Sequence, residues 1–407
     1  MRTLIFILQC IITAAATTSF SPSSTLAAYT TSSSLSSQSS TTSDTSICDG
    51  NTATTRQQWC SYDIYTDYTT TVPETGITAS PDGRERFALA INGSIPGPTI
   101  EADWGDTVIV HVTNSLPDSV KNGTSVHFHG IRQHYTNSMD GVVSITQCPT
   151  APGSTVTYKW RAMQYGTTWY HSHIGLQAWE GLFGGIVIHG PASENYDKDL
   201  GVMFLNDWDI STVDELYDYA QSEGPPTLDN GLINGTNVYG SDEGNQTGWR
   251  WNTTFAEGTS YRLRLVNAAV DTHFKFMVDN HTLTVIANDL VPIQPYETTV
   301  LDIVMREYRP NSCITSAVPV FMLIVYDGTG QRYDVIITAD QASVADSFWL
   351  RAIPQEACSE NESSDNIRGI IYYGSFTSTP KASAYDYTDS CSDEDSSNLT
   401  PMVNLCS

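Results

Sequence analysis

Short apolar runs that alternate with polar turns fill the chain from Tyr62 onward. Apolar residues dominate the runs 87–91, 107–112, 156–160 and 182–188, and the run 107–112 is rich in β-branched residues. Runs of this length, broken by turn residues, are typical of β-strands. No long stretch has the 3.6-residue period of an amphipathic helix. The pattern therefore predicts an all-β chain built as a sandwich or a barrel.

One turn-and-strand pattern occurs twice along the chain. An Ile-Asn-Gly-Ser turn at 91–94 precedes a β-rich run, and an Ile-Asn-Gly-Thr turn at 233–236 precedes the run 261–267. The Asn-Gly step is a tight-turn signal. We predict two copies of one sandwich module, at 48–190 and 191–392. Chance similarity of two short segments is the alternative.

The ends of the chain depart from this pattern. Residues 1–20 combine a positively charged start with a short apolar stretch and predict a signal peptide, with a buried N-terminal helix as the alternative. Residues 21–47 are almost all Ser, Thr and Ala and predict a disordered spacer. Residues 393–407 form a tail, whose acidic run 393–395 is predicted to be solvated surface. No other apolar stretch is long enough to cross a membrane.

Charge and glycosylation motifs point to the secretory pathway. The formal net charge of −26 argues against nucleic acid and against anionic membranes as partners. Many Asn-X-Ser/Thr sequons in one chain indicate N-glycans and an extracellular location. The sequons begin at Asn92, Asn122, Asn234, Asn245, Asn252, Asn280, Asn361 and Asn398.

In a secreted chain the cysteines are interpreted as disulfides. Cys10 leaves with the signal peptide, Cys48 and Cys60 bracket a short polar segment, and Cys358 and Cys391 bracket a Ser- and Asp-rich loop. We expect each bracketing pair to bond. Cys148, Cys313 and Cys406 have no obvious partner.

The candidate chemistry lies in two His-X-His pairs, His127 with His129 and His171 with His173. Side chains alternate along a strand, so the members of each pair point the same way, about 6–7 Å apart. Two such strands facing each other would bring four neutral imidazoles together, which suits copper, zinc, iron or nickel. Hydrogen-bonded core histidines are the alternative interpretation. The other histidines show no pairing and are expected to be surface or packing residues.

These histidine segments resemble the first two copper-binding signatures of fungal laccases, nearest to the ascomycete kind, in the multicopper oxidase family. The matching stretches read HFHGIRQ at 127–133, MDGV at 139–142, TQCP at 146–149, GTTWYHSH at 166–173, and GLFG at 181–184 after Gln177. Phe128 stands where the family usually has Trp. The resemblance extends from about Cys48 to the C-terminus and implies Greek-key sandwich domains of the cupredoxin type.

The resemblance also implies a cofactor and roles for particular residues. By position, His127 is similar to the type 2 copper ligand, and His129, His171 and His173 are similar to type 3 ligands. Asp140 resembles the acid that assists proton delivery to oxygen, and Glu243 lies near where ascomycete laccases keep an acid that accepts the phenol proton. Phenols or aromatic amines would be oxidised while dioxygen is reduced to water.

The chain departs from the family in two respects. The last two copper signatures, with four cluster histidines and the type 1 site, are missing, so a third domain after 393–407 is expected to be absent. Cys148 is consistent with this absence, since its counterpart in the family forms a disulfide with a cysteine near the far C-terminus. Residues 304–329 have no family counterpart; they are either translated non-coding sequence, which we favour, or an extra hairpin.

Three functions follow from these observations. The first is a secreted, monomeric, laccase-type oxidase, truncated or incomplete as given. The second is a non-catalytic, secreted copper-binding glycoprotein. The third, ranked last, is a two-domain oxidase completed by a trimer.

Overall fold

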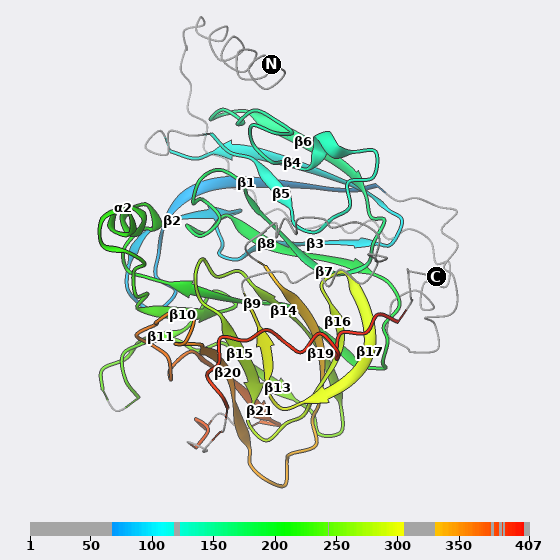
Figure 1. Ribbon diagram of the computed structural model, residues 1–407, viewed down its shortest axis with the longest axis vertical. Coiled ribbons are helices and arrows are strands. Elements are labelled where there is room, and N and C mark those ends of the chain that lie inside the picture. The colour runs from blue at the N-terminus through cyan, green and yellow to red at the C-terminus, as the bar shows by residue number, and fades with distance from the viewer. Residues whose placement is uncertain are drawn as a thin grey trace, which may run out of the picture.

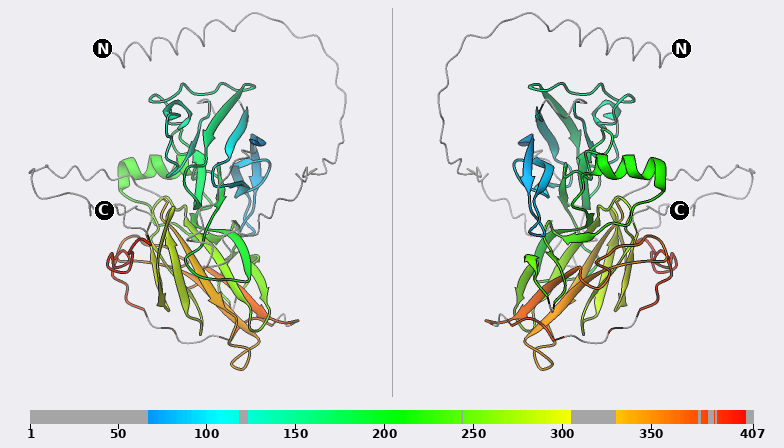
Figure 2. Two further views of the ribbon diagram at one scale, coloured as in Figure 1. Left: turned by 90° about the vertical axis from the view of Figure 1, so that its right-hand side faces the viewer. Right: turned by 90° about the vertical axis from the view of Figure 1, so that its left-hand side faces the viewer.

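The computed structural model describes residues 67–117, 123–242, 244–304, 330–375, 378–381, 385 and 387–402. Within them, two pairs of β-sheets follow one another along the chain, the first in the upper part of Figure 1 and the second below it (Figures 1 and 2). The first pair has the strand orders β2-β1-β4-β6 and β3-β8-β7-β5. The second has the orders β10-β9-β14-β19-β16-β17 and β13-β21-β20-β15-β18. The expected all-β class is confirmed.

The strands of the first pair are β1 (Asp67–Ala79), β2 (Arg86–Ile91), β3 (Gly97–Asp103), β4 (Thr107–Ser115), β5 (Val126–Phe128), β6 (Thr155–Arg161), β7 (Gly166–Ser172) and β8 (Phe183–His189). A short 3-10 helix, η3, covers Asn137–Met139. The later elements are β9 (Lys198–Trp208), α2 (Val213–Glu223), β10 (Asn230–Ile233), β11 (Val238–Tyr239), β12 (Thr247–Gly248), β13 (Asn252–Phe255), β14 (Ser260–Asn267), β15 (Phe274–Val278), β16 (Leu283–Asn288), β17 (Val291–Thr298), β18 (Leu301–Ile303), β19 (Arg332–Thr338), β20 (Ser347–Pro354) and β21 (Arg368–Tyr373).

Burial along the strands shows why these runs form sandwiches. In β4, Val108, Val110 and Val112 are buried, and the residues between them are partly exposed, so one face fills the core. In β7 all seven residues are buried. β7 lies inside its sheet and is covered on both faces, since Trp169 packs against Phe204 of β9. Each sheet pair encloses its own large apolar cluster.

The faint sequence repeat corresponds to a repeat of topology. In the order β2-β1-β4-β6, β1 pairs antiparallel with β2 and parallel with β4, and β4 pairs antiparallel with β6. The order β10-β9-β14-β19 has the same three relations in the same sequence. Both Asn-Gly turns use left-handed backbone, with φ of 55° and 76° at Asn92 and Gly93 and 50° and 80° at Asn234 and Gly235.

One helix was not predicted. α2 begins after Thr212, whose side chain accepts the N–H of Glu215 while the Glu215 carboxylate accepts the N–H of Thr212, a capping box. Only Val213 of this helix is buried, so its apolar periodicity was too weak to detect. Among the described residues, no helix is long and apolar enough to span a bilayer.

The cysteine predictions have mixed outcomes. Cys358 and Cys391 are disulfide-bonded, with their Cα atoms 5.0 Å apart, as predicted. Cys148 is also disulfide-bonded, contrary to the expectation that it lacks a partner. Cys10, Cys48, Cys60, Cys313 and Cys406 lie outside the described residues.

Several other predictions fall on residues outside the described part, namely 1–20, 21–47 and 305–329. The described chain on the two sides of this last segment is in contact, because the N–H of Val304 donates to Oε1 of Gln331 at 2.8 Å. The prediction for the acidic run is wrong in part. Asp393 is half-buried and accepts from Nε2 of Gln331 at 3.1 Å, because the tail packs on the second sheet pair through the buried Leu399.

One glycosylation sequon does not fit the structure. The side chain of Asn361 is buried, and its Nδ2 donates to the carbonyl of Asn230 at 3.0 Å, so no space remains for a glycan. Among the described sequons, the exposed ones begin at Asn92, Asn245, Asn252, Asn280 and Asn398, while Asn234 is partly exposed.

The buried His281 generates a prediction about pH. Its Nδ1–H donates to the carbonyl of Asp279 at 2.8 Å, and its Nε2 accepts the hydroxyl of Tyr373 at 2.7 Å. Burial lowers the pKa of His281 below its usual range, so the folded state holds this ring neutral. The unfolded ring binds a proton below about pH 6.5, so the contribution of His281 is present above that pH and is lost as the pH falls through the lower, folded-state pKa.

The unfolding free energy of the wild type should fall between pH 8 and pH 5. We expect it to fall by less in the variant His281→Gln. Urea titrations of the wild type and the variant at both pH values measure this. Equal pH dependence in the two chains would contradict the prediction.

Candidate metal centre

The four predicted histidines lie side by side on two neighbouring strands. β5 and β7 pair antiparallel with His127 directly opposite His171, so both point to the same face of the sheet. His129 and His173 lie just beyond the ends of these strands. The strands are neighbours in one sheet and do not face each other across the sandwich. The expected pair of strands that face each other is therefore corrected to a pair of neighbours within one sheet.

The four rings form one compact cluster. Ring centroids of His127 lie 5.7, 5.4 and 5.5 Å from those of His129, His171 and His173. The centroid of His171 lies 5.6 Å from that of His129 and 6.0 Å from that of His173. Ring nitrogens of His127, His129 and His171 all lie within 4.8 Å of one another. The strand pairing therefore brings all four imidazoles together.

Hydrogen bonds assign the nitrogens that remain for a ligand. Nδ1 of His127 donates to the backbone carbonyl of Asp140 at 2.7 Å, and Nδ1 of His171 donates to the carbonyl of Ser172 at 2.9 Å. In each ring Nε2 then carries the lone pair. Nδ1 of His129 lies 3.4 Å from Nε2 of His171. Two nitrogens about 2.0–2.1 Å from one tetrahedral metal ion are about 3.3 Å apart, so this spacing fits shared coordination.

Burial keeps the centre of the cluster uncharged. His171 is buried, and burial together with the neighbouring His127 and His173 lowers the pKa of its imidazole to about 3. The ring is therefore neutral at the pH of most media and able to donate its lone pair. His173 is exposed, and His127 and His129 are half-buried, so one side of the cluster faces solvent in the described chain.

Trp169 forms the wall of the cluster on the side of the second sheet pair. Its ring centroid lies 4.4 Å from that of His171 and 5.4 Å from that of His129. A Cβ on Gly330 would lie 2.4 Å from Nε1 of Trp169, so only glycine permits this approach. The adjacent Thr168 donates its hydroxyl to the carbonyl of His129. The orientation of the His129 and His171 rings thus depends on both sheet pairs.

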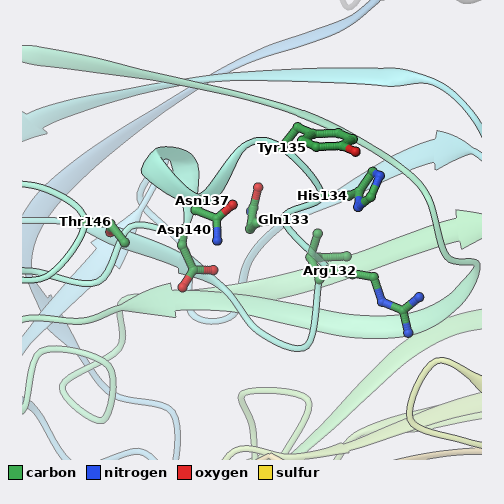
Figure 3. Close-up of a pocket in the computed structure, with 8 residues that line it drawn as sticks. Arg132, Gln133, His134, Tyr135, Asn137, Asp140 and Thr146 are labelled. Atoms are coloured by element: carbon green, nitrogen blue, oxygen red, sulfur yellow. The ribbon is translucent and has the colours of Figure 1, made fainter.

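Asp140 lies between His127 and a polar pocket. Its Oδ1 is 3.5 Å from Nδ1 of His127. The pocket, about 550 Å³ in volume, is formed by the segment 131–146; Figure 3 shows Asp140 and Asn137 on one side and Arg132 and His134 on the other. Glu243, the second predicted acid, lies outside the described residues.

A second, apolar pocket was not predicted. It has a volume of about 300 Å³ and lies beneath α2, between Leu216, Leu228 and Leu176 of the loop that follows His173. Asp271 is the one charged side chain among its lining residues, and burial raises the pKa of this carboxyl. No local motif marks Asp271, because the pocket joins segments about 95 residues apart in the chain.

Two family models with the description "Multicopper oxidase" match residues 74–193 and 199–307, together more than half of the chain. The chain belongs to the multicopper oxidase family. The resemblance stated from the histidine segments is therefore confirmed, and the metal of this family is copper.

Individual relatives agree. "Laccase-2" of Botryotinia fuckeliana is 45% identical over 89% of this chain and 60% of that protein. "Dihydrogeodin oxidase" of Aspergillus terreus is 38% identical over 87% of this chain and 58% of that protein. The crystal structure of a laccase from Botrytis aclada superposes with a TM-score of 0.73 at 44% identity, covering 86% of this chain and 63% of that one. The chain thus spans about three fifths of the length of each of these three relatives.

The approach of Gly141 to β5 generates a prediction. Gly141 has a φ of +77°, and a Cβ there would lie 1.7 Å from the carbonyl oxygen of Val126. Gly93 has a φ of +76° with nothing within 4 Å of its Cβ position. Gly141→Ala adds a steric clash to the cost of left-handed backbone, about 1–2 kcal/mol, whereas Gly93→Ala carries only that cost. We expect the larger loss of unfolding free energy for Gly141→Ala in urea titrations. Equal losses of unfolding free energy in the two variants would contradict the prediction, because they would show that the loop at Gly141 moves away from β5 at no cost.

Proposed function

We propose that this chain carries the first half of the oxygen-reducing copper site of a laccase-type oxidase. The observation that supports the proposal is the cluster of four imidazoles, in which the ring centroids of His127 and His171 lie 5.4 Å apart and backbone hydrogen bonds assign the lone pair of each of these two rings to Nε2. His127 would hold the type 2 copper, and His129, His171 and His173 would hold type 3 copper. The neutral, partly buried donor set suits copper.

Bound copper supplies one-electron redox chemistry, which couples oxidation of phenols or aromatic amines to reduction of dioxygen to water. The residues of the chain handle protons around this chemistry. The carboxylate of Asp140 lies between His127 and the polar pocket, and it would pass protons from solvent toward the cluster. Trp169 and Thr168 orient the rings.

The apolar pocket beneath α2 would bind the phenolic ring. Its lining is mostly aliphatic, and its one carboxylate, Asp271, is placed to accept the proton that a phenol releases on oxidation. Glu243 remains the candidate that sequence position supports. Asp271 is the candidate that the geometry of the described residues supports.

The remaining predictions stay part of this proposal. They are secretion after removal of residues 1–20, N-glycans on the exposed sequons, a spacer at 21–47, and sandwich domains at 48–190 and 191–392. A doubtful insert at 304–329 and a tail at 393–407 complete the proposed organisation.

Copper content tests the ligand assignment. We expect His127→Ala and His173→Ala each to weaken copper retention more than about 10-fold, since loss of even an outer hydrogen bond to a ligand costs this much. His111→Ala is the control, because His111 lies on β4 in the opposite sheet, where its ring forms an exposed hydrogen bond with Thr157. Elemental analysis after dialysis, with circular dichroism to check folding, measures the result. Unchanged copper in both ligand variants would refute the assignment.

Oxygen uptake separates the oxidase from the non-catalytic copper-binding glycoprotein. The oxidase proposal predicts oxygen consumption when a methoxylated phenol is added to the copper-loaded chain. Copper retention without oxygen consumption would favour the binding protein.

Asp271 tests the substrate pocket. We expect Asp271→Asn to lower kcat/KM for a phenol about 100-fold and to leave oxidation of ferrocyanide, which releases no proton, unchanged. Asp218→Asn, an exposed change on α2, is the control. An equal loss of kcat/KM for the phenol and for ferrocyanide would assign Asp271 a structural role.

A further inference from the structure

A buried tyrosine from the opposite sheet contacts the outer edge of β5. Tyr158 lies in β6 and is 1% exposed. Its hydroxyl oxygen accepts the N–H of Val126 at 3.0 Å and donates to Oε1 of Gln147 at 2.7 Å. The side chain thus crosses the sandwich core and ends on the residue that directly precedes His127.

This contact matters because β5 is a three-residue strand at the edge of its sheet. Its inner edge pairs with β7. The N–H of His173 donates to the backbone carbonyl of Ser125, and the N–H of His129 donates to the backbone carbonyl of Trp169. The N–H of Val126 points the other way, where no further strand of that sheet follows. A buried N–H without an acceptor is costly, so the strand would move to find one.

We propose that Tyr158, held in place by Gln147, is a positioning residue that fixes the backbone of β5 and thereby aims the imidazole of His127. The proposal rests on the proposed copper site for its functional meaning. His127 is anchored at two points, its Nδ1 at the carbonyl of Asp140 and its backbone through Val126. Loss of either anchor changes the direction of Nε2.

The hydroxyl of Tyr158 keeps its proton at all working pH values, because burial raises its pKa to about 12. It therefore donates to Gln147 and accepts from Val126 at the same time. The ring of Tyr158 also packs edge-on against Phe128, with centroids 5.3 Å apart. Phenylalanine at position 158 would retain this packing and remove only the hydroxyl.

Tyr170 provides a matched control. It lies in β7 beside His171, is fully buried, and donates its hydroxyl to the carbonyl of Pro98 at 2.7 Å. Tyr158→Phe and Tyr170→Phe therefore each remove one buried tyrosine hydroxyl bonded to backbone near the cluster. Only Tyr158→Phe removes a contact to β5.

The experiment compares the full chain with both variants in three measurements. These are urea unfolding, the Cu(II) dissociation constant with the electron paramagnetic resonance spectrum, and histidine ring NMR of the metal-free chain. We expect Tyr158→Phe to weaken Cu(II) binding about 10-fold or more, to change the Cu(II) spectrum, and to shift the His127 ring signals. Tyr170→Phe should lose similar stability and leave all three copper and histidine readouts unchanged.

Equal copper affinity and unshifted His127 signals in Tyr158→Phe would overturn the proposal, as would equal effects of both variants. If Tyr158→Phe does not fold, Gln147→Met removes the partner of the hydroxyl and is expected to shift the same His127 signals by a smaller amount. If the wild type binds no Cu(II), the proposed function fails, and the NMR of the metal-free chain still decides whether Tyr158 positions His127.

Discussion

The pairing of β5 with β7 is the interaction on which the candidate site depends. Its register places His127 opposite His171, and alternation along each strand brings His129 and His173 to the same face. A slip of β5 by one residue would turn His127 and His129 to the other face, away from His171 and His173. Since β5 has only three residues, its own ladder cannot secure this register, and the surrounding sandwich must supply the remaining contacts.

Those contacts come from three directions. The loop at Asp140 and Gly141 closes over β5 and accepts the Nδ1–H of His127. The opposite sheet contributes Tyr158, and the second sheet pair contributes the residues that press on Trp169. The rings are thus oriented by groups that do not themselves offer a ligand atom. Such outer contacts reduce the reorganisation that metal binding requires.

Electrostatics is consistent with a site for metal cations. The chain as a whole is strongly acidic, whereas His171 at the cluster centre is held neutral, because burial lowers its pKa to about 3. Proton binding therefore competes little with metal binding at His171. The two pockets differ in character. One is polar and adjoins Asp140, and the other is apolar with Asp271 as the one charged residue of its lining.

The sequence by itself determined the all-β class, the two Asn-Gly turns, the Cys358–Cys391 disulfide and the two His-X-His pairs, because each depends on residues close together in the chain or on strand periodicity. It missed α2, whose capping box is local but whose apolar face is nearly absent, and it misjudged Asp393 and Asn361, whose burial depends on distant partners. Only the tertiary structure decided that β5 and β7 are neighbours in one sheet, that Tyr158 reaches Val126, and that Asp271 enters an apolar pocket. These contacts join segments tens of residues apart, and their geometry follows from how whole sheets pack, which no local pattern records.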